Sequence, residues 1–334
     1  IALIVILLRA GFATKKDTLN RIGKTAALMG FVPAVFEGAA ITFIAPFFFD
    51  ISILESAILG FIVAAVSPAI VVPMMLRFIE SNKGAKKGIP TLLLASSSLD
   101  NVFAIVLSSA LIGMYSGKGT NIFMKLLEIP VSISLGIALG AAIGFALYRV
   151  FKKYQPRATK EGMIVIGSAI LLTWIEKTVR PFVAVSALSG VIAIGFIILE
   201  KSEPIAHKIS RKLGKIWVFA EILLFVLVGA QVNIHVAWNA GLAGLMIIFT
   251  GLIARSVGTY ISLIKTGFSI REKLFCMASY IPKATVQAAI GAVPLSLGVK
   301  SGDIILAVAV LAILFTAPLG AIGMNIIGEK VLEK

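Results

Sequence analysis

Apolar runs of about 20 residues recur from one end of this chain to the other. A run of that length is what an α-helix needs to cross the hydrocarbon core of a bilayer. Of the 334 residues, 59% are hydrophobic and only 14% are charged, and the mean hydropathy is +1.02. Soluble domains carry about 25% charged residues and are far less apolar. The sequence therefore predicts an all-α polytopic membrane protein.

The apolar runs predict about eleven membrane spans. Their expected ranges are 1–13, 25–49, 52–76, 90–114, 122–148, 162–178, 182–199, 216–236, 238–264, 274–298 and 304–328. The first run is short and is already apolar at Ile1, and no signal peptide is recognisable. We therefore expect that the chain lacks its true N-terminus.

Positive charge is distributed unevenly over the loops between these spans. Of the 31 Lys and Arg, 23 fall in the loops after the odd-numbered spans and in the C-terminal tail, whereas five fall in the other loops or at the span ends beside them. Loops rich in lysine and arginine face the cytoplasm. We expect a multi-pass protein of the cell (inner) membrane with a cytoplasmic C-terminus. The net charge of +15 is then a topology signal, and nucleic-acid binding is not expected.

Two of the expected spans contain prolines that would interrupt a helix. The third span contains Pro68 and Pro73, and the tenth contains Pro282 and Pro294. Proline removes a backbone donor and clashes with the preceding turn, so the freed backbone groups must face protein or a water-filled cavity. The third and tenth spans are seven spans apart in chain order. Because successive spans alternate in direction, these two run in opposite directions. This pattern predicts inverted repeats with two crossed discontinuous transmembrane helices, as in secondary transporters.

Six ionisable residues within the apolar spans stand out, three acids and three bases, which is the balance expected if they pair. They are Arg9, Glu37, Asp100, Glu221, Arg255 and Lys283. Arg255 lies in the middle of its span and stays charged, so it needs an anion. We expect Asp100 to be that anion, either in a purely structural bridge or in a pair that also serves transport.

Three of the other four charges within the spans have more than one expected role or partner. Lys283 follows the break at Pro282, where a cation can neutralise the C-terminal end of a half-helix, and a proton-carrying role is equally open. Glu37 is expected to pair with Lys283 or to titrate itself. Glu221 lies nearer the predicted cytoplasmic end of its span, where a snorkelling or structural role is expected. Arg9 lies within a turn of the predicted cytoplasmic end and is expected to snorkel.

Oxygen ligands gather near the first break and around Asp100. Ser67 precedes Pro68, and Ser97 belongs to the serine run before Asp100 and Asn101. Hydroxyl, amide and freed carbonyl oxygens are hard ligands that suit a small alkali cation. We expect Na⁺ or Li⁺ to bind at Asp100 and Asn101, with help from the other three residues. The alternative is that each serine bonds only to its own helix backbone.

The sequence does not predict a disulfide, a Cys/His metal site or an enzyme active site. Cys276 is the only cysteine, and the only histidines are His207 and His235, so neither an internal disulfide nor a Cys/His metal site is expected. No Ser/His/Asp set and no phosphate-binding loop is recognisable. We expect a protein that is not an enzyme and has no cofactor beyond the transported ions.

Five segments resemble the cation/proton antiporter superfamily, and within it the NHA-type sodium/hydrogen exchangers and their bacterial relatives. They are IVILLRAGF (4–12), VSPAIVVPMML (66–76), KKGIPTLLLASSSLDNVFAI (86–105), LLFVLVGAQVNI (223–234) and IPKATVQAAIGAV (281–293). The resemblance covers essentially the whole chain. It implies that N-terminal helices are missing here.

The resemblance also implies a homodimer in which a core domain moves against a scaffold. On that pattern, scaffold and dimerisation helices are expected at 1–13 and 182–236. The first core repeat is expected at 25–114 and the second at 238–328, with linking helices at 122–178.

Residue by residue, the resemblance points to the charges already singled out. Asp100 and Asn101 occupy the two positions of the family's paired acidic motif, and Arg255 occupies the position of the basic partner. Lys283 and Glu37 fall where relatives also carry lysine and glutamate.

Asn101 departs from the family pattern, because most relatives carry an aspartate there that binds the ion and exchanges it for protons. An amide can bind a cation but does not titrate. Three explanations remain. Asn101 is a deliberate replacement that traps the transporter, or the titrating role has moved to Asp100, Glu37 or Glu221, or proton coupling has been lost.

The function we expect is exchange of protons for a monovalent alkali cation by alternating access, with Na⁺ or Li⁺ before K⁺, and possible impairment through Asn101. One alternative is a non-transporting cation sensor or a channel, although most spans supply few polar residues for a pore. The other is a sodium-coupled organic-anion symporter. The expected partners are monovalent cations, protons, the lipid bilayer and a second copy of the chain.

Overall fold

The computed structural model describes residues 2–14, 16–115, 122–179, 183–230 and 234–332. All regular elements within these ranges are helices, as the sequence predicts. In chain order they are α1 (Ala2–Ala13), α2 (Lys16–Met29), α3 (Val32–Ile44), the 3₁₀ turn η1 (Ala45–Phe47), α4 (Ile53–Val63), α5 (Pro68–Glu80), α6 (Ile89–Tyr115), α7 (Ile122–Tyr154), α8 (Ala158–Val179), α9 (Ala187–Lys201), α10 (Glu203–Ala230), α11 (Ile234–Ser262), α12 (Ile270–Ser279), α13 (Thr285–Ile290), α14 (Val293–Ser296) and α15 (Gly302–Val331).

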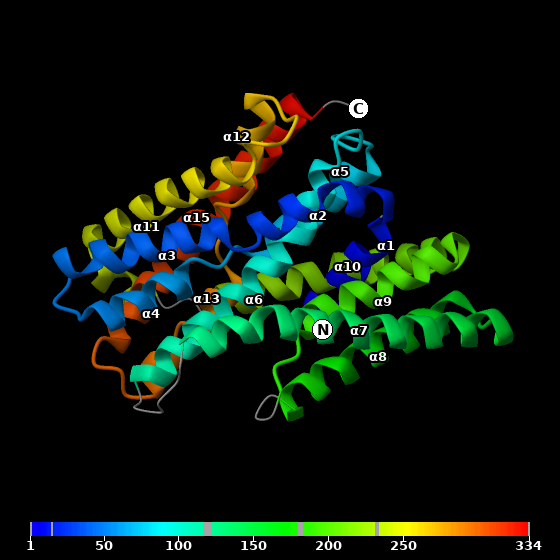
Figure 1. Ribbon diagram of the computed structural model, residues 1–334, viewed down its shortest axis with the longest axis horizontal. Helices are drawn as coiled ribbons and strands as arrows, with labels where there is room; N and C mark the ends of the chain where they lie inside the picture. Colours follow the sequence, from blue (N-terminus) through cyan, green and yellow to red (C-terminus); the bar gives the residue numbers. More distant parts are fainter. Residues whose placement is uncertain (1, 15, 116–121, 180–182, 231–233, 333–334) are drawn as a thin grey trace.

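The helices form two groups that lie side by side (Figure 1). In one group α9 packs against α1, α7, α8 and α10. In the other, α11 packs against α3 and α15, and α4 packs against α3 and α15. Helix α6 lies between the groups and contacts α4 and α5 as well as α7. Asp100, the one charged residue of α6, therefore lies on a helix that contacts both groups.

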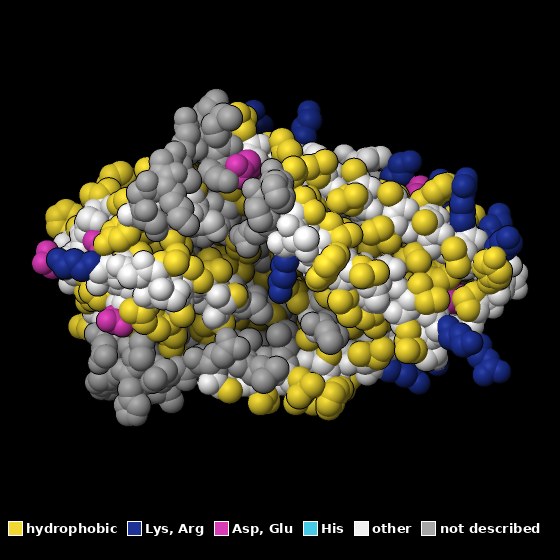
Figure 2. Space-filling model, turned by 90° about the horizontal axis from the view of Figure 1, so that it is seen from below, with side chains coloured by type: hydrophobic (Ala, Val, Ile, Leu, Met, Phe, Trp, Pro, Cys, Tyr) yellow, Lys and Arg dark blue, Asp and Glu magenta, His cyan; other side chains and the backbone are white. Residues whose placement is uncertain are grey.

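The outer surface of the molecule is apolar, as contact with lipid requires. Figure 2 shows hydrophobic side chains spread over the face seen from below, with many of the lysines and arginines at its right-hand end. Large side chains that the protein leaves exposed include Phe47, Trp174 and Leu242. This distribution agrees with a multi-pass membrane protein.

Seven helical stretches within the described residues are long and apolar enough to cross a membrane. They are Ile22–Phe47, Ile53–Glu80, Ile89–Tyr115, Leu127–Tyr154, Ala158–Val179, Ala240–Ser262 and Gly302–Val331. The predicted number of about eleven is therefore not confirmed. The difference arises at four of the predicted spans. Helices α1 and α9 have only 12 and 15 residues. The predicted tenth span is divided into short helices, and the predicted span 216–236 runs through residues 231–233, outside the described part.

The third predicted span is interrupted, but at one proline only. Helix α4 ends at Val63 and α5 begins at Pro68. Pro68 occupies the first turn of α5, where its missing N–H leaves no hydrogen bond unmade. Pro73 lies inside α5, which continues past it to Glu80, so Pro73 does not interrupt the span.

The tenth predicted span is interrupted as well. Helix α12 ends at Ser279, and Pro282 lies in the non-helical segment before α13 begins at Thr285. Pro294 lies in the first turn of the short helix α14. This span is thus divided into three short helices.

The two interrupted helices run in opposite directions. Phe78 of α5 packs edge to face on Phe275 of α12, with ring centroids 5.7 Å apart. Gln287 of α13 donates a hydrogen bond of 3.1 Å to the carbonyl oxygen of Ile62 in α4. The first half of each interrupted helix therefore lies beside the second half of the other, which is the arrangement of crossed discontinuous helices.

Candidate functional site

The two breaks meet through the main chain. The backbone N–H of Ser67 donates a hydrogen bond of 2.9 Å to the carbonyl oxygen of Pro282. Neither group can bond within its own helix, because both lie in the interruptions. Buried backbone groups need hydrogen-bond partners in a membrane. Here the first break provides the donor and the second break provides the acceptor.

Arg255 of α11 reaches into this crossing and is 1% exposed. Its Nε donates to the carbonyl oxygen of Tyr280 at 2.7 Å, and one terminal nitrogen donates to Oδ1 of Asp100 at 2.8 Å. The other terminal nitrogen donates to Oε2 of Glu37 at 2.8 Å and also to the carbonyl oxygen of Ala64. The guanidinium thus joins the carbonyl ends of both interrupted helices to two carboxylates.

Asp100 of α6 is fully buried and uses both of its carboxylate oxygens. Oδ1 accepts from Arg255, and Oδ2 accepts from the backbone N–H of Val66 at 2.8 Å. Val66 lies just before the N-terminus of α5, where a negative charge is favoured by the helix dipole. The expected pairing of Asp100 with Arg255 is present.

Lys283 and Glu37 form a second buried pair, with 2.6 Å between Nζ and Oε2 and no exposure of either side chain. Lys283 Nζ also lies 3.4 Å from the carbonyl oxygen of Ala64, at the C-terminal end of α4. A cation at that end compensates the helix dipole, as expected from the sequence. Oε2 of Glu37 therefore serves Lys283 and Arg255 together, which the sequence did not predict.

The four charged side chains balance. Arg255 and Lys283 contribute two positive charges, and Asp100 and Glu37 contribute two negative ones. A buried charge without a partner costs several kcal/mol. Any change of charge in this cluster must therefore be matched by an opposite change.

Four oxygens in the segments that meet here have no hydrogen-bond partner within the described protein. They are Oγ of Ser67, Oδ1 of Asn101, Oγ1 of Thr285 and Oε1 of Glu37. Ser67 and Thr285 flank the two breaks, and Asn101 follows Asp100 on α6. Buried polar atoms are nearly always bonded, so these four oxygens are candidates for binding water or an ion. All four atoms can accept from a donor or coordinate a cation.

Several polar residues of the crossing were not singled out from the sequence. The side-chain amide of Gln287 donates to the carbonyl oxygens of Ile62, Val63 and Ala65 at 3.1, 3.1 and 2.8 Å, and its oxygen accepts from Ala284. One amide thereby satisfies most of the first break. Its signal in the sequence was a polar residue five positions after Pro282 in an apolar span.

Thr316 of α15 and Tyr280 at the second break were missed as well. The backbone N–H of Lys283 donates to Oγ1 of Thr316 at 2.9 Å, and the guanidinium of Arg255 lies 4.9 Å from the centre of the Tyr280 ring. Both contacts hold the two buried cations in place.

Two of the expected residues, Ser97 and Arg9, behave differently from the main expectation. The hydroxyl of Ser97 donates to the carbonyl oxygen of Leu94 at 3.1 Å, as in the alternative of bonding within its own helix. Arg9 does not simply extend to water, because it pairs with Glu80 at 2.8 Å and is 13% exposed. The side chain of Glu221 lies outside the described part.

Comparison with known sequences gives a consistent result. The family described as "Sodium/hydrogen exchanger, transmembrane" matches residues 1–330. The chain is 32% identical over 347 residues to sodium/hydrogen exchanger 9B2 of Mus musculus, covering 100% of this chain and 62% of that protein. It is 30% identical over 350 residues to sodium/hydrogen exchanger 9B1 of Homo sapiens, covering 100% of this chain and 66% of that protein. The chain thus spans about two thirds of the length of these relatives, or slightly less.

The fold has a solved counterpart. The sodium proton antiporter MjNhaP1 from Methanocaldococcus jannaschii, determined at pH 8, superposes with a TM-score of 0.78 at 19% sequence identity, covering 100% of this chain and 85% of that one. At that identity the comparison establishes the antiporter fold. Together with a family match that extends over 1–330, it confirms the resemblance seen in the sequence: the chain belongs to the sodium/hydrogen exchanger family.

Proposed function

We propose that this protein exchanges protons for a monovalent alkali cation across a membrane, with Na⁺ or Li⁺ preferred to K⁺. The observation that carries the proposal is the neutral buried cluster at the crossing, in which Oε2 of Glu37 is shared by Lys283 and Arg255. The similar proteins are named as sodium/hydrogen exchangers, which supports the same activity here.

The cation is held by hard oxygen atoms at the crossing. Oδ1 of Asn101, Oγ of Ser67 and Oγ1 of Thr285 are buried and have no partner in the described protein, and these are the ligand types that alkali cations prefer. The carboxylate of Asp100 adds negative charge nearby and is held by Arg255 and Val66. The carbonyl of Pro68 and the hydroxyl of Ser97 are secondary candidates.

Proton coupling runs through Lys283 and Glu37. A cation that enters a neutral buried cluster must displace a positive charge, because an unbalanced charge is costly there. An arginine guanidinium keeps its charge, whereas a lysine ammonium can release a proton. Loss of that proton leaves Glu37 and Asp100 to balance Arg255 and the incoming cation. On this account Asn101 binds the cation without titrating, and the coupling role has moved away from position 101.

The wider assembly follows the family pattern in this proposal. The groups around α9 and α11 act as scaffold and core, the core moves to give alternating access, and two chains form a homodimer. The scaffold would include 1–13 and 182–236, and the protein would reside in the cell (inner) membrane with its C-terminus in the cytoplasm.

Transport in proteoliposomes tests the proposal. The full-length protein is reconstituted with a pH-sensitive dye inside, and Na⁺, Li⁺ or K⁺ is added outside. We expect cation-driven proton movement with the chain as it is, none with Lys283→Gln, and unchanged movement with Lys160→Gln, an exposed lysine used as the control. Exchange that appears only with Asn101→Asp would contradict the proposed coupling and assign it to position 101.

The same assay separates the main alternative. A cation sensor that lacks transport is compatible with a non-titrating Asn101. A sensor would show no proton movement when Na⁺, Li⁺ or K⁺ is added. In a separate melting experiment, the cation would still stabilise it.

A further inference from the structure

A cavity of about 320 Å³ lies away from the crossing, between α2, the start of α6 and the connection from α11 to α12. Its lining combines two kinds of surface. Ile22 and Leu92, with Phe268, supply apolar side chains, whereas Lys86, Lys87 and Lys265 supply cations, and Thr25 and Thr266 add hydroxyls. Such a mixture suits an amphiphile rather than a purely apolar or purely ionic ligand.

Only one of the three lysines that line this cavity is paired with a carboxylate. Lys87 Nζ lies 2.7 Å from Oε2 of Glu272, so one ammonium group is already paired. Within the described part of the chain, Lys86 and Lys265 have no carboxylate partner. The cavity therefore carries an excess of two positive charges, which favours an anionic ligand.

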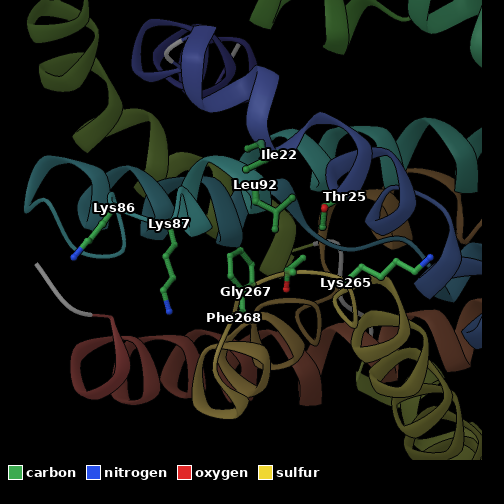
Figure 3. Close-up of a pocket in the computed structure, with 9 residues that line it drawn as sticks. Ile22, Thr25, Lys86, Lys87, Leu92, Lys265, Gly267 and Phe268 are labelled. Carbon is green, nitrogen blue, oxygen red and sulfur yellow. The ribbon is translucent and has the colours of Figure 1, made fainter.

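The lysines surround the apolar part of the cavity. Figure 3 shows Lys86 and Lys87 at one end and Lys265 at the other, with Leu92 and Phe268 between them. The side chains extend in different directions, and the flexible four-carbon stem of lysine allows each ammonium group to turn toward a bound anion. An anionic group can thus be reached from both ends while apolar atoms rest on the middle.

Two of the segments that line the cavity adjoin the ends of predicted membrane spans. The connections before α6 and before α12 belong to the lysine-rich loops that the charge distribution places on the cytoplasmic side. Basic pockets between transmembrane helices on that side bind phosphate-bearing headgroups. We propose that this cavity binds a phosphate-bearing anion, supplied by an anionic phospholipid or by a soluble phosphate. The ligand would join α2 to the connection between α11 and α12.

Lipid retention measures this binding directly. The full-length protein is incorporated into phosphatidylcholine nanodiscs containing phosphatidylglycerol, re-extracted, and examined by native mass spectrometry. The double variant Lys86→Gln/Lys265→Gln removes the two unpaired cations and leaves the Lys87–Glu272 pair intact. We expect its affinity for phosphatidylglycerol to fall by about 30-fold, from about 1 kcal/mol for each lysine near a membrane surface.

A matched pair of lysines controls for charge. Lys160→Gln/Lys212→Gln removes two exposed lysines of α8 and α10 on the same predicted side, away from the cavity, and should retain the lipid as the unmodified protein does. Inorganic phosphate is tested in parallel by thermal stability in detergent. A soluble anion is supported if phosphate raises the melting temperature of the unmodified protein but not of the Lys86→Gln/Lys265→Gln variant, and if lipid retention shows no difference between them. Equal retention by all three proteins together with no phosphate-dependent shift overturns the proposal.

Discussion

Nζ of Lys283 lies 2.6 Å from Oε2 of Glu37, and both side chains are completely buried. Removing one partner of such a pair typically costs about 3–5 kcal/mol, because the other charge is left unpaired. The same carboxylate oxygen also accepts from Arg255 at 2.8 Å, so it keeps a cationic partner when Lys283 loses its proton. This arrangement makes Lys283 the member of the cluster whose charge can change with the smallest penalty.

The packing of α15 against the second break gives a sharp pair of variants. A Cβ at Gly320 would overlap the ring of Pro282, whereas a Cβ at Gly323 meets nothing within 4 Å. We expect Gly320→Ala to lower stability by about 1–3 kcal/mol through overpacking. Gly323→Ala should be neutral or slightly stabilising, because alanine is the better helix former. Melting temperatures in detergent compare the two, and equal values would contradict the close approach.

Gln287 is expected to be essential for closing the first break. Gln287→Leu leaves three backbone carbonyls and the N–H of Ala284 without their partner. Each buried unsatisfied group costs about 1–3 kcal/mol, so the loss should amount to several kcal/mol. Thr250→Val provides the comparison, since that hydroxyl donates only to its own helix. A melting temperature for Gln287→Leu that matches the Thr250→Val protein would show that the amide contacts are dispensable.

Arg9 and Glu80 link α1 to the end of α5, across the proposed boundary between scaffold and core. Glu80 is 65% exposed, so the coupling free energy should be small, about 0.2–1 kcal/mol. It should fall further at high salt, since exposed charges are screened. A double-mutant cycle of Arg9→Gln and Glu80→Gln on thermal stability measures it. A coupling that is large and independent of salt would be inconsistent with an exposed link.

Glu272 should make stability depend on pH in the acid range. It precedes the predicted span 274–298. Burial acts to raise its pKa, but hydrogen bonds from Lys87 and Ser269 outweigh burial and lower the pKa below 4.5. A lowered folded-state pKa stabilises the protein above the unfolded-state value, and this contribution is lost as the pH falls through the folded-state pKa.

Glu272→Gln should therefore be destabilising at neutral pH and progressively less so below about pH 4.5. Melting curves of both proteins between pH 7 and pH 3 provide the measurement. A difference in melting temperature that stays constant over this range would exclude the carboxylate as its source.

The sequence predicted those parts of the site that follow from strong energetic demands. Arg255 stays charged at any membrane depth, so a buried anion was required, and Asp100 was available. Pro68 and Pro282 could be assigned to breaks because proline changes backbone bonding within its own helix. The crossing of the two breaks also followed from their opposite directions along the chain.

The remaining contacts depend on how helices far apart in sequence face one another. Glu37 could be paired with one cation from the sequence, but its contact with both Lys283 and Arg255 requires α3, α11 and the second break to meet at one point. Gln287 is uncharged, so its presence in an apolar span gave only a weak signal. The sequence predicts a break at Pro73 as well, but α5 continues past it, because a proline within a helix can be tolerated when neighbouring groups compensate.

Proton release on cation binding tests the central claim most directly. The full-length protein in detergent and a weakly buffered solution with a pH indicator is titrated with Na⁺, while binding is followed separately by calorimetry. We predict release of about one proton for each bound cation, as charge balance in the buried cluster requires. Lys283→Gln should bind Na⁺ without releasing a proton. Binding without proton release by the unmodified chain, or release that persists in Lys283→Gln, would contradict coupling through Lys283.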